Sequence, residues 1–465
     1  MKIKFLIYFI LSIFGLGSLK SESKPNIIYI NADDLGVMDV GFMGNKIYKT
    51  PNLDQMAREG MVFTNAYAPA ANCAPSRAAC MTGQYASRTG VYTVNTSERG
   101  PAKERKLIPT KNNLFISEEN LTIAGALKGA GYTTAQIGKW HVTHDPTRNG
   151  FDVNVAGSQV GHPKSYFSPY INLVISDGPK GEYLTDRLTD ESIKFITKNK
   201  KNPFFLYLPY YTVHKPLQGR KDLLEKYQDI KGVNAHYAAM IEAMDENIGR
   251  ILAHLEKLNL RENTLVLFTS DNGAIRSISN QSPHRGGKGT YYEGGIREPL
   301  VIRWPAKVKA GSRCELPVFG LDFFPTFIEA ARIQLPPEKI LDGISLMPVL
   351  TQSSSPVDRA LFWHYPIYLQ AYKKGEDGSR DPLFRTRPGS SMRYKQWKLH
   401  EFFEDGCFEL YNLTEDPGES KNLVDLEVDT FKSLKKQLLE WRNRLDCPVP
   451  KKLNPKYDPS ISKVY

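Results

Sequence analysis

Residues 25–34 read Pro-Asn-Ile-Ile-Tyr-Ile-Asn-Ala-Asp-Asp, a short apolar run that ends in two adjacent carboxylates. This length and composition predict a buried strand that carries acidic side chains at its C-terminal end. Three similar runs follow, at 133–137, 204–208 and 264–269. We therefore expect this first strand to lie in the interior of a sheet.

Segments with helical periodicity separate these runs, at 52–59, 121–130, 184–197 and 237–258. Alternating strands and helices predict an α/β fold, with a large mixed, mostly parallel sheet flanked by helices. In open sheets of this kind, ligands bind beyond the C-terminal ends of the strands. The polar motifs described below fall at these positions.

The remaining segments indicate a leader and a second domain. Residues 1–20 combine Lys2 and Lys4 with an apolar run and then small residues, which predicts a secretory signal peptide and export to the periplasm or the medium. No other stretch is long enough to span a bilayer, so we expect no stable membrane insertion after cleavage. Residues 24–350 form the predicted catalytic domain. After a Ser/Pro-rich linker, residues 356–465 form a smaller domain with an antiparallel sheet and a helix at 431–445.

The composition is that of an ordinary globular protein, with 465 residues of which 41% are hydrophobic. The 61 basic and 50 acidic residues give a net charge of +11, which would help to attract a polyanionic substrate. No nucleic-acid-binding motif is present, so we expect no nucleic-acid partner. The five cysteines match no zinc pattern. With Cys73 set aside for chemistry, the other four allow at most two disulfides in three connectivities.

Residues 73–83 read Cys-Ala-Pro-Ser-Arg-Ala-Ala-Cys-Met-Thr-Gly. Pro75 suits the first turn of a helix, and Arg77 would lie on the same face as Cys73. The backbone N–H groups of a helix N-terminus bind anions, and a guanidinium can pair with two oxygens of a sulfate or phosphate group. The segment therefore predicts a nucleophile that faces a bound oxyanion.

Two pairs of oxygen-bearing side chains follow predicted strands, Asp33-Asp34 and Asp271-Asn272. Carboxylate and amide oxygens are the ligands of Ca²⁺ or Mg²⁺ rather than of zinc or copper. Three carboxylates held together would repel one another and an anionic substrate unless a cation lay between them. The two pairs therefore predict a hard-cation site.

The segment at 73–83 resembles the signature of the type I sulfatases, in the alkaline-phosphatase-like superfamily. This resemblance implies that Cys73 is oxidised to formylglycine (3-oxoalanine) by a formylglycine-generating enzyme. Gln84 departs from the pattern, because the family often has Arg there. The resemblance also favours calcium over magnesium, with one ion per chain held by Asp33, Asp34, Cys73, Asp271 and Asn272.

Three further segments look like sulfatase blocks: Gly-Lys-Trp-His at 138–141, Thr-Val-His-Lys-Pro at 212–216, and Gly-Lys-Gly-Thr-Tyr-Tyr-Glu-Gly-Gly at 287–295. The resemblance implies that Lys139 and Lys288 bind the sulfate and leaving-group oxygens. It gives His141 the role of steadying the formylglycine hydrate, and His214 that of protonating the departing alcohol. One hydroxyl of that hydrate would attack sulfur, and the second would allow sulfate to leave.

The resemblance predicts a sulfuric ester hydrolase that acts on a sulfated carbohydrate, with ulvan or carrageenan ahead of animal glycosaminoglycans. Residues 161–169 look like an insertion of bacterial sulfatases that act on polysaccharides. Six side chains are candidates for contacts to the sugar: Arg148, His162, His284, Arg285, Arg387 and Arg393. Six aromatic residues either stack on sugar rings or belong to the core: Tyr166, Phe167, Tyr170, Trp363, Tyr365 and Tyr368.

Two alternatives remain open at this point. A phosphonate or phosphodiester hydrolase of the same superfamily shares the start of the motif, but such enzymes tend to have His where this chain has Asn272. A catalytically inactive glycan-binding homologue would lack catalytic side chains, whereas every expected position here carries the expected residue type.

Overall fold

The computed structural model describes residues 23–354 and 357–461. The predicted signal peptide at 1–20 therefore lies outside the described residues. Within the described ranges, no helix is both long enough and apolar enough to cross a membrane.

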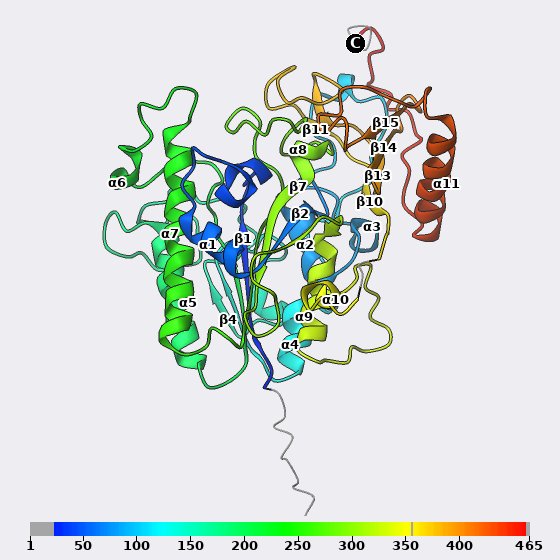
Figure 1. Ribbon diagram of the computed structural model, residues 1–465. Coiled ribbons are helices and arrows are strands. Elements are labelled where there is room, and N and C mark those ends of the chain that lie inside the picture. The colour runs from blue at the N-terminus through cyan, green and yellow to red at the C-terminus, as the bar shows by residue number, and fades with distance from the viewer. Residues whose placement is uncertain (1–22, 355–356, 462–465) are drawn as a thin grey trace, which may run out of the picture.

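A nine-stranded sheet forms the centre of the larger domain (Figure 1). Its strand order is β4-β3-β5-β1-β6-β7-β2-β8, with β9 paired to β2. The strands are β1 (Asn26–Ala32), β2 (Met61–Tyr67), β3 (Thr133–Ile137), β4 (Val153–Val155), β5 (Phe204–Pro209), β6 (Thr264–Ser270), β7 (Arg297–Arg303), β8 (Ser312–Cys314) and β9 (Val318–Phe319). β1 lies between β5 and β6 and is parallel to both, whereas β7 is antiparallel to β6 and β2. The prediction of a mixed, mostly parallel sheet is confirmed.

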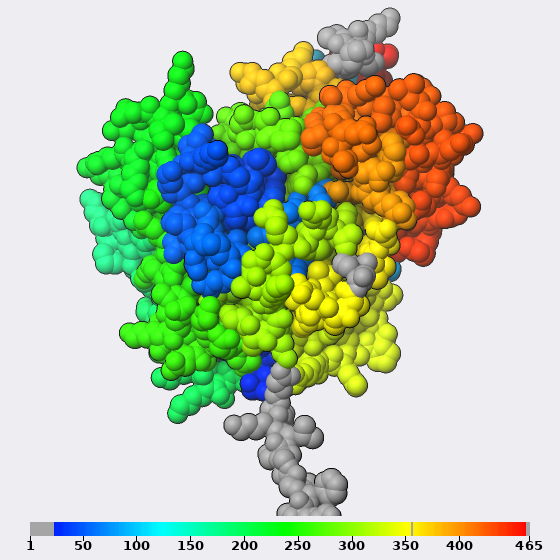
Figure 2. All heavy atoms as spheres, in the orientation of Figure 1, coloured from blue at the N-terminus to red at the C-terminus, as the bar shows by residue number. Residues whose placement is uncertain are grey.

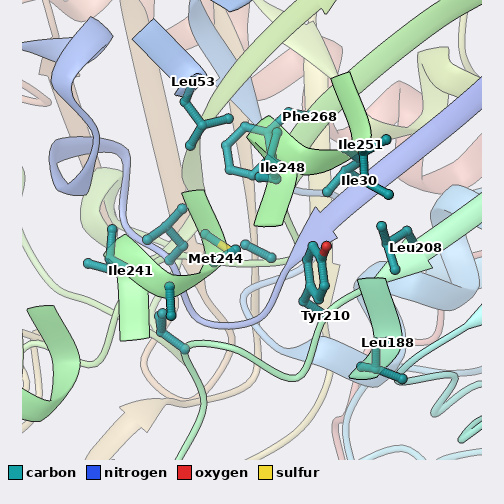
Figure 3. Close-up of a cluster of buried hydrophobic side chains, with 14 of the residues drawn as sticks. Ile30, Leu53, Leu188, Leu208, Tyr210, Ile241, Met244, Ile248, Ile251 and Phe268 are labelled. Carbon is teal, nitrogen blue, oxygen red and sulfur yellow. The ribbon is translucent and has the colours of Figure 1, made fainter. Parts of the chain in front are cut away.

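Helices cover both faces of this sheet. One apolar cluster joins Ile28 and Ile30 of β1 to α1, α5 and α7, as Figure 3 shows for Ile30, Met244 and Ile248. A second joins Ile27 and Tyr29 to α2, α4 and α9, because alternate strand residues point to opposite faces. The helices of the larger domain are α1 (Pro51–Glu59), α2 (Cys73–Thr82), α3 (Ala86–Thr89), α4 (Ile123–Gly129), α5 (Leu184–Asn199), α6 (Lys221–Leu224), α7 (Ala235–Lys257), α8 (Glu293–Ile296), α9 (Phe323–Ala330) and α10 (Met347–Leu350).

Local signals explain where these helices begin. The side chain of Asn234 accepts a hydrogen bond from the backbone N–H of Tyr237 at the start of α7, and Thr122 caps α4 in the same way. Pro51 occupies the first turn of α1, where a missing N–H costs nothing.

The C-terminal region forms a four-stranded antiparallel sheet and one long helix, as predicted. The sheet has the order β10 (Leu361–Tyr365), β13 (Gly389–Tyr394), β14 (Trp397–Phe402), β15 (Phe408–Asn412), and β11 (Leu369–Gln370) pairs with β12 (Phe384–Thr386). α11 (Val428–Arg444) buries Leu434, Leu438 and Trp441 against the sheet residues Met392 and Leu399. Figures 1 and 2 show this region, coloured from yellow through orange to red, at one side of the molecule.

Burial decides the open question about the six aromatic residues. Tyr166, Tyr170, Trp363, Tyr365 and Tyr368 are buried, and Phe167 is half-buried, so the core interpretation holds for the first five. Their polar atoms have partners inside the protein. Trp363 donates to the carbonyl of Ala68 at 2.9 Å, for example. The suggestion that these rings are available for stacking on sugar is therefore wrong for Tyr166, Tyr170, Trp363 and Tyr368, whereas Tyr365 is buried but lines a cavity.

The cysteines form no disulfide. All five lie in the described part of the chain and are free, with Cys407 exposed and the other four buried. None of the three possible connectivities is therefore realised.

Candidate active site

The predicted polar residues lie at the C-terminal ends of adjacent parallel strands. Asp33 and Asp34 follow β1, and Asp271 and Asn272 follow β6, whose Ser270 is paired with Ala32. Lys139 follows β3. The strand order alone therefore brings these side chains to one edge of the sheet.

The four oxygen-bearing residues form a buried group, since none of Asp33, Asp34, Asp271 and Asn272 is more than 2% exposed. Asn272 donates to Oδ1 of Asp34 at 2.8 Å, and Oδ1 of Asp271 accepts from the backbone N–H of Asp34 at 3.2 Å. Oδ1 of Asp33 and Oδ1 of Asn272 have no hydrogen-bond partner among the described residues. Buried oxygens without partners are costly unless a cation or water completes them, so this donor set fits a hard cation.

α2 places Cys73 and Arg77 beside this group. The helix begins at Cys73, and Pro75 lies in its first turn. The side chain of Arg77 is 1% exposed, and its Nε and Nη2 both lie 2.8 Å from Oδ2 of Asp271. Its Nη1 donates to the backbone carbonyl of Lys139 at 3.0 Å. Arg77 therefore fixes the end of β3 against the end of β6 and holds a positive charge near Cys73.

Two buried lysines balance the carboxylates. Nζ of Lys139 lies 2.6 Å from Oδ2 of Asp33, and Nζ of Lys288 lies 2.6 Å from Oδ1 of Asp34. Burial alone would raise the pKa of Asp34, but Lys288, His214 and Lys139 hold it below its usual range. Together with Arg77, the lysines give three cations for three carboxylates. A divalent cation that binds together with a sulfate dianion would leave this balance unchanged.

Two histidines face the same group. Nδ1 of His214 lies 2.7 Å from the carbonyl of Lys215, which makes Nδ1–H the donor there and leaves Nε2, at 3.7 Å from Oδ2 of Asp34, for chemistry. Burial and the charge of Lys288 lower the pKa of His214 to about 3, and burial and Lys139 lower the pKa of His141. An anion bound beside the rings would raise both pKa values, so proton transfer by either ring is favoured in the substrate complex.

Only one of the six candidate sugar contacts lies against this centre in the described residues. The ring of His162 stacks on that of His214 with centroids 5.6 Å apart. His284 is buried, and the four arginines are engaged by other protein groups. Arg148 pairs with Glu118, Arg285 with the carbonyls of Gly378 and Glu419, Arg387 with Asp381 and Glu404, and Arg393 lies over the ring of Tyr67.

Sequence reasoning did not identify the residues that support the Lys288 loop. Nη1 of Arg385 donates to the carbonyl of Lys288 at 3.1 Å, and Thr386 donates to the carbonyl of Gly289. Behind the loop, Lys398 of β14 pairs with Glu293 at 2.8 Å, and both side chains are fully buried. No motif marks these positions, because they come from the C-terminal domain and depend on how the two domains pack.

Comparison with known proteins agrees with this geometry. A family model described as Sulfatase matches residues 25–333, and one described as N-sulphoglucosamine sulphohydrolase, C-terminal, matches residues 287–444. The chain is 34% identical to a protein of Formosa agariphila named Sulfatase, over 92% of this chain and 90% of that protein. It is 32% identical to the human steryl-sulfatase, over 97% of this chain and 92% of that enzyme.

Solved structures with a similar fold cover most of this chain as well. The crystal structure of Ps i-CgsB superposes with a TM-score of 0.77 at 30% identity, covering 95% of this chain and 96% of that one. A phosphonate monoester hydrolase of Agrobacterium radiobacter shares the fold, with a TM-score of 0.66 at 21% identity, covering 90% of this chain and 96% of that one. Relatives named as sulfatases thus match nearly the whole chain in sequence, and the residues expected from the sequence to be catalytic meet at one sheet edge. The chain belongs to the sulfatase family, in the alkaline-phosphatase-like superfamily, and is an enzyme that hydrolyses sulfate esters.

Proposed function

We propose that this enzyme removes sulfate from a sulfated carbohydrate, of the ulvan or carrageenan type, using formylglycine at position 73 and one Ca²⁺. The observation that supports this best is the meeting of Arg77, Lys139 and Lys288 with the buried acidic group beside the N-terminus of α2. A tetrahedral oxyanion bound there would be contacted by cations on several sides.

Asp33, Asp34, Asp271 and Asn272 would hold the cation, together with the group derived from Cys73. Ca²⁺ suits this set because every protein donor is an oxygen and two donor oxygens lack other partners. When bound, the cation would supply positive charge that stabilises the reacting oxygens. A formylglycine-generating enzyme is the proposed maturation partner, and the proposed signal peptide would export the chain.

The protein's own side chains would orient the sulfate and move protons. Formylglycine, when present as its hydrate, supplies two hydroxyl groups on one carbon, one for attack on sulfur and one for later release of sulfate. Arg77 and Lys139 would hold the sulfate oxygens, and Lys288 would neutralise the leaving oxygen. Nε2 of His214 would carry the proton to that oxygen, and Nδ1 of His141, which has no partner in the described residues, would accept the proton of the second hydroxyl.

Several relatives support a carbohydrate substrate, whereas the steryl-sulfatase is named for a different sulfate ester. N-acetylgalactosamine-6-sulfatases from several mammals, including the human enzyme at 33% identity over 78% of this chain, are named for a sugar substrate. Ps i-CgsB has been crystallised in complex with the oligosaccharide k-i-k-neocarrahexaose. The net charge of +11 would attract a polyanionic polymer at low salt.

The test is sulfate release by protein co-expressed with a formylglycine-generating enzyme. Oligosaccharides of ulvan, carrageenan and glycosaminoglycans would be compared with one aryl sulfate and one aryl phosphonate. Cys73→Ala should abolish release, whereas Cys407→Ala, which removes an exposed cysteine, should not. Cleavage of the phosphonate alone, or release by the Cys73→Ala protein, would overturn the proposal.

A further inference from the structure

Arg385 is a buried cation without an acidic partner. Its side chain belongs to β12 and the residue is 7% exposed. Nε donates to the carbonyl of Gln370 at 2.9 Å, Nη1 donates to that of Lys288 at 3.1 Å, and the guanidinium lies 3.6 Å from the ring centroid of Tyr372. These contacts hold one face and one edge of the group. The remaining N–H groups have no hydrogen-bond partner in the part of the chain that the structure describes.

A second unpaired arginine approaches from another segment. Arg99 is half-buried, and its Nη2 donates to the carbonyl of Val94 at 2.6 Å. Its segment runs beside β11, since the backbone N–H of Tyr368 donates to the carbonyl of Ser97 at 2.9 Å. Burial and the charge of Arg385 lower the pKa of Arg99, while Tyr372 and Cys73 act in the opposite direction. Because Arg385 donates to the carbonyl of Gln370 in the same strand, β11, the segment that carries Arg99 lies beside the strand that Arg385 contacts.

The neighbouring arginines Arg380 and Arg387 differ from Arg385 because each forms an ion pair with a carboxylate. Arg385 lines a cavity of about 340 Å³ between the Lys288 loop and the C-terminal domain, together with Arg380 and Arg387. Arg380 pairs with Asp405 at 2.5 Å, and Arg387 pairs with Glu404 at 2.6 Å. No ion pair joins Arg99 or Arg385 to a carboxylate within residues 23–354 and 357–461. Two partly desolvated like charges repel each other, and a bound anion would remove that cost.

We propose that Arg99 and Arg385 bind a second anionic group of the substrate, a sulfate or a carboxylate on the sugar that carries the scissile sulfate or on its neighbour. This inference rests on the proposed function and narrows its substrate to carbohydrates with at least two oxyanion groups. Arg385 holds the backbone of Lys288, whose side chain reaches the acidic group, so the two anion sites are about one lysine side chain apart. The adjoining cavity is of a size that accepts a small ligand such as a sugar unit.

The test is a binding measurement on the Cys73→Ala protein, which needs no turnover. Calorimetry would compare a monosulfated disaccharide with two matched ligands, one with a second sulfate and one with a uronate carboxylate. We expect one of the doubly charged ligands to bind about tenfold more tightly or better, which is the usual effect of one or two charged hydrogen bonds. Arg99→Gln should remove this preference, as should Arg385→Gln. Arg444→Gln, which removes an exposed charge on α11, should retain it.

The outcomes separate the two proposals. Equal affinity for all three ligands, or a preference that survives Arg99→Gln, would overturn the second anion site. Arg99→Gln is the decisive variant, because Arg385→Gln also removes a contact to the Lys288 loop. Whether tighter binding follows the sulfate or the carboxylate identifies the source of the second anion. Failure of the proposed function would instead appear as an absence of sulfate release from every sugar, whatever the binding results.

Discussion

Replacing Lys398 by methionine should destabilise the protein, because it removes the cation from a fully buried ionic cluster. Nζ of Lys398 lies 2.8 Å from Oε1 of Glu293 and 3.1 Å from Oε1 of Glu419, and none of the three side chains is exposed. Burial alone would raise the pKa of Glu293, but Lys398 and Arg297 hold it below its usual range. Glu293 is therefore charged at neutral pH, and the methionine variant must bury it without Lys398.

Breaking a buried ion pair from one side costs about 3–5 kcal/mol. We expect about 3 kcal/mol here, because other groups continue to contact both carboxylates. Nη1 of Arg297 stays 3.5 Å from Glu293, and Glu419 still accepts from the backbone N–H of Glu293 at 2.6 Å. For a chain of 465 residues, an unfolding entropy of about 2.1 cal/mol/K per residue amounts to roughly 1 kcal/mol/K. The melting temperature should therefore fall by about 3 °C.

Differential scanning calorimetry would measure this shift in the wild-type and Lys398→Met proteins. Lys436→Met is the matched control, because that lysine is 78% exposed and lies 3.9 Å from Glu440, where a pair contributes little. Adding Glu293→Gln to Lys398→Met should restore part of the loss by removing one buried charge. A melting temperature for Lys398→Met within about 1 °C of wild type, or an equal loss in the control, would refute the reasoning.

Three further predictions concern pH, arginine geometry and metal. Burial lowers the pKa of His364 to about 3, so its stabilising contribution is present above the ordinary value of about 6.5 and is lost as the pH falls. Between pH 6.5 and 5 the free energy of unfolding of the wild type, measured in urea, should fall by about 1.6 kcal/mol more than that of His364→Gln; the same pH dependence in both proteins would contradict this. Arg77→Lys should lower kcat/KM for an aryl sulfate about 100-fold when both proteins have the same formylglycine content. The reason is that one ammonium group cannot replace the guanidinium contacts to both Asp271 and the carbonyl of Lys139. A loss of less than about threefold would argue against this role. Ca²⁺ should raise the melting temperature more in the presence of sulfate than without it, and Asn272→Ala should weaken the effect; equal shifts would count against the site.

The fold could be predicted from the sequence for those strands whose own residue composition is typical of a buried strand. β1, β5 and β6 are mainly apolar runs, β3 is a short run rich in β-branched residues, and the ends of all four follow the predictions closely. β2 and β7 were not predicted. β7 contains Pro299 and two charged residues near its start, which interrupts the pattern of a central strand, and the pairing that makes it one is antiparallel and distant in sequence.

Some residues of the candidate site could likewise be predicted from the sequence, and others could not. Residues at the ends of parallel strands, such as Asp33 and Asp271, could be placed together because the strand order does so. The contacts of Arg385 could not be, because they depend on where the C-terminal domain packs. Nor does sequence distinguish a buried tyrosine from an exposed one when its hydroxyl is satisfied by backbone, as Tyr166 is by the carbonyl of His214 at 2.9 Å.

The geometry of the lysines explains why metal and sulfate should bind together. Lys139 and Lys288 are paired with oxygens of Asp33 and Asp34, which are also the expected metal ligands. A cation and a lysine cannot both neutralise the same carboxylate fully, so a bound cation would weaken these pairs and free the ammonium groups to contact an anion. The anion in turn would lower the cost of placing a divalent ion among three cationic side chains. Each ligand would therefore increase the affinity for the other by the same factor, as linkage requires.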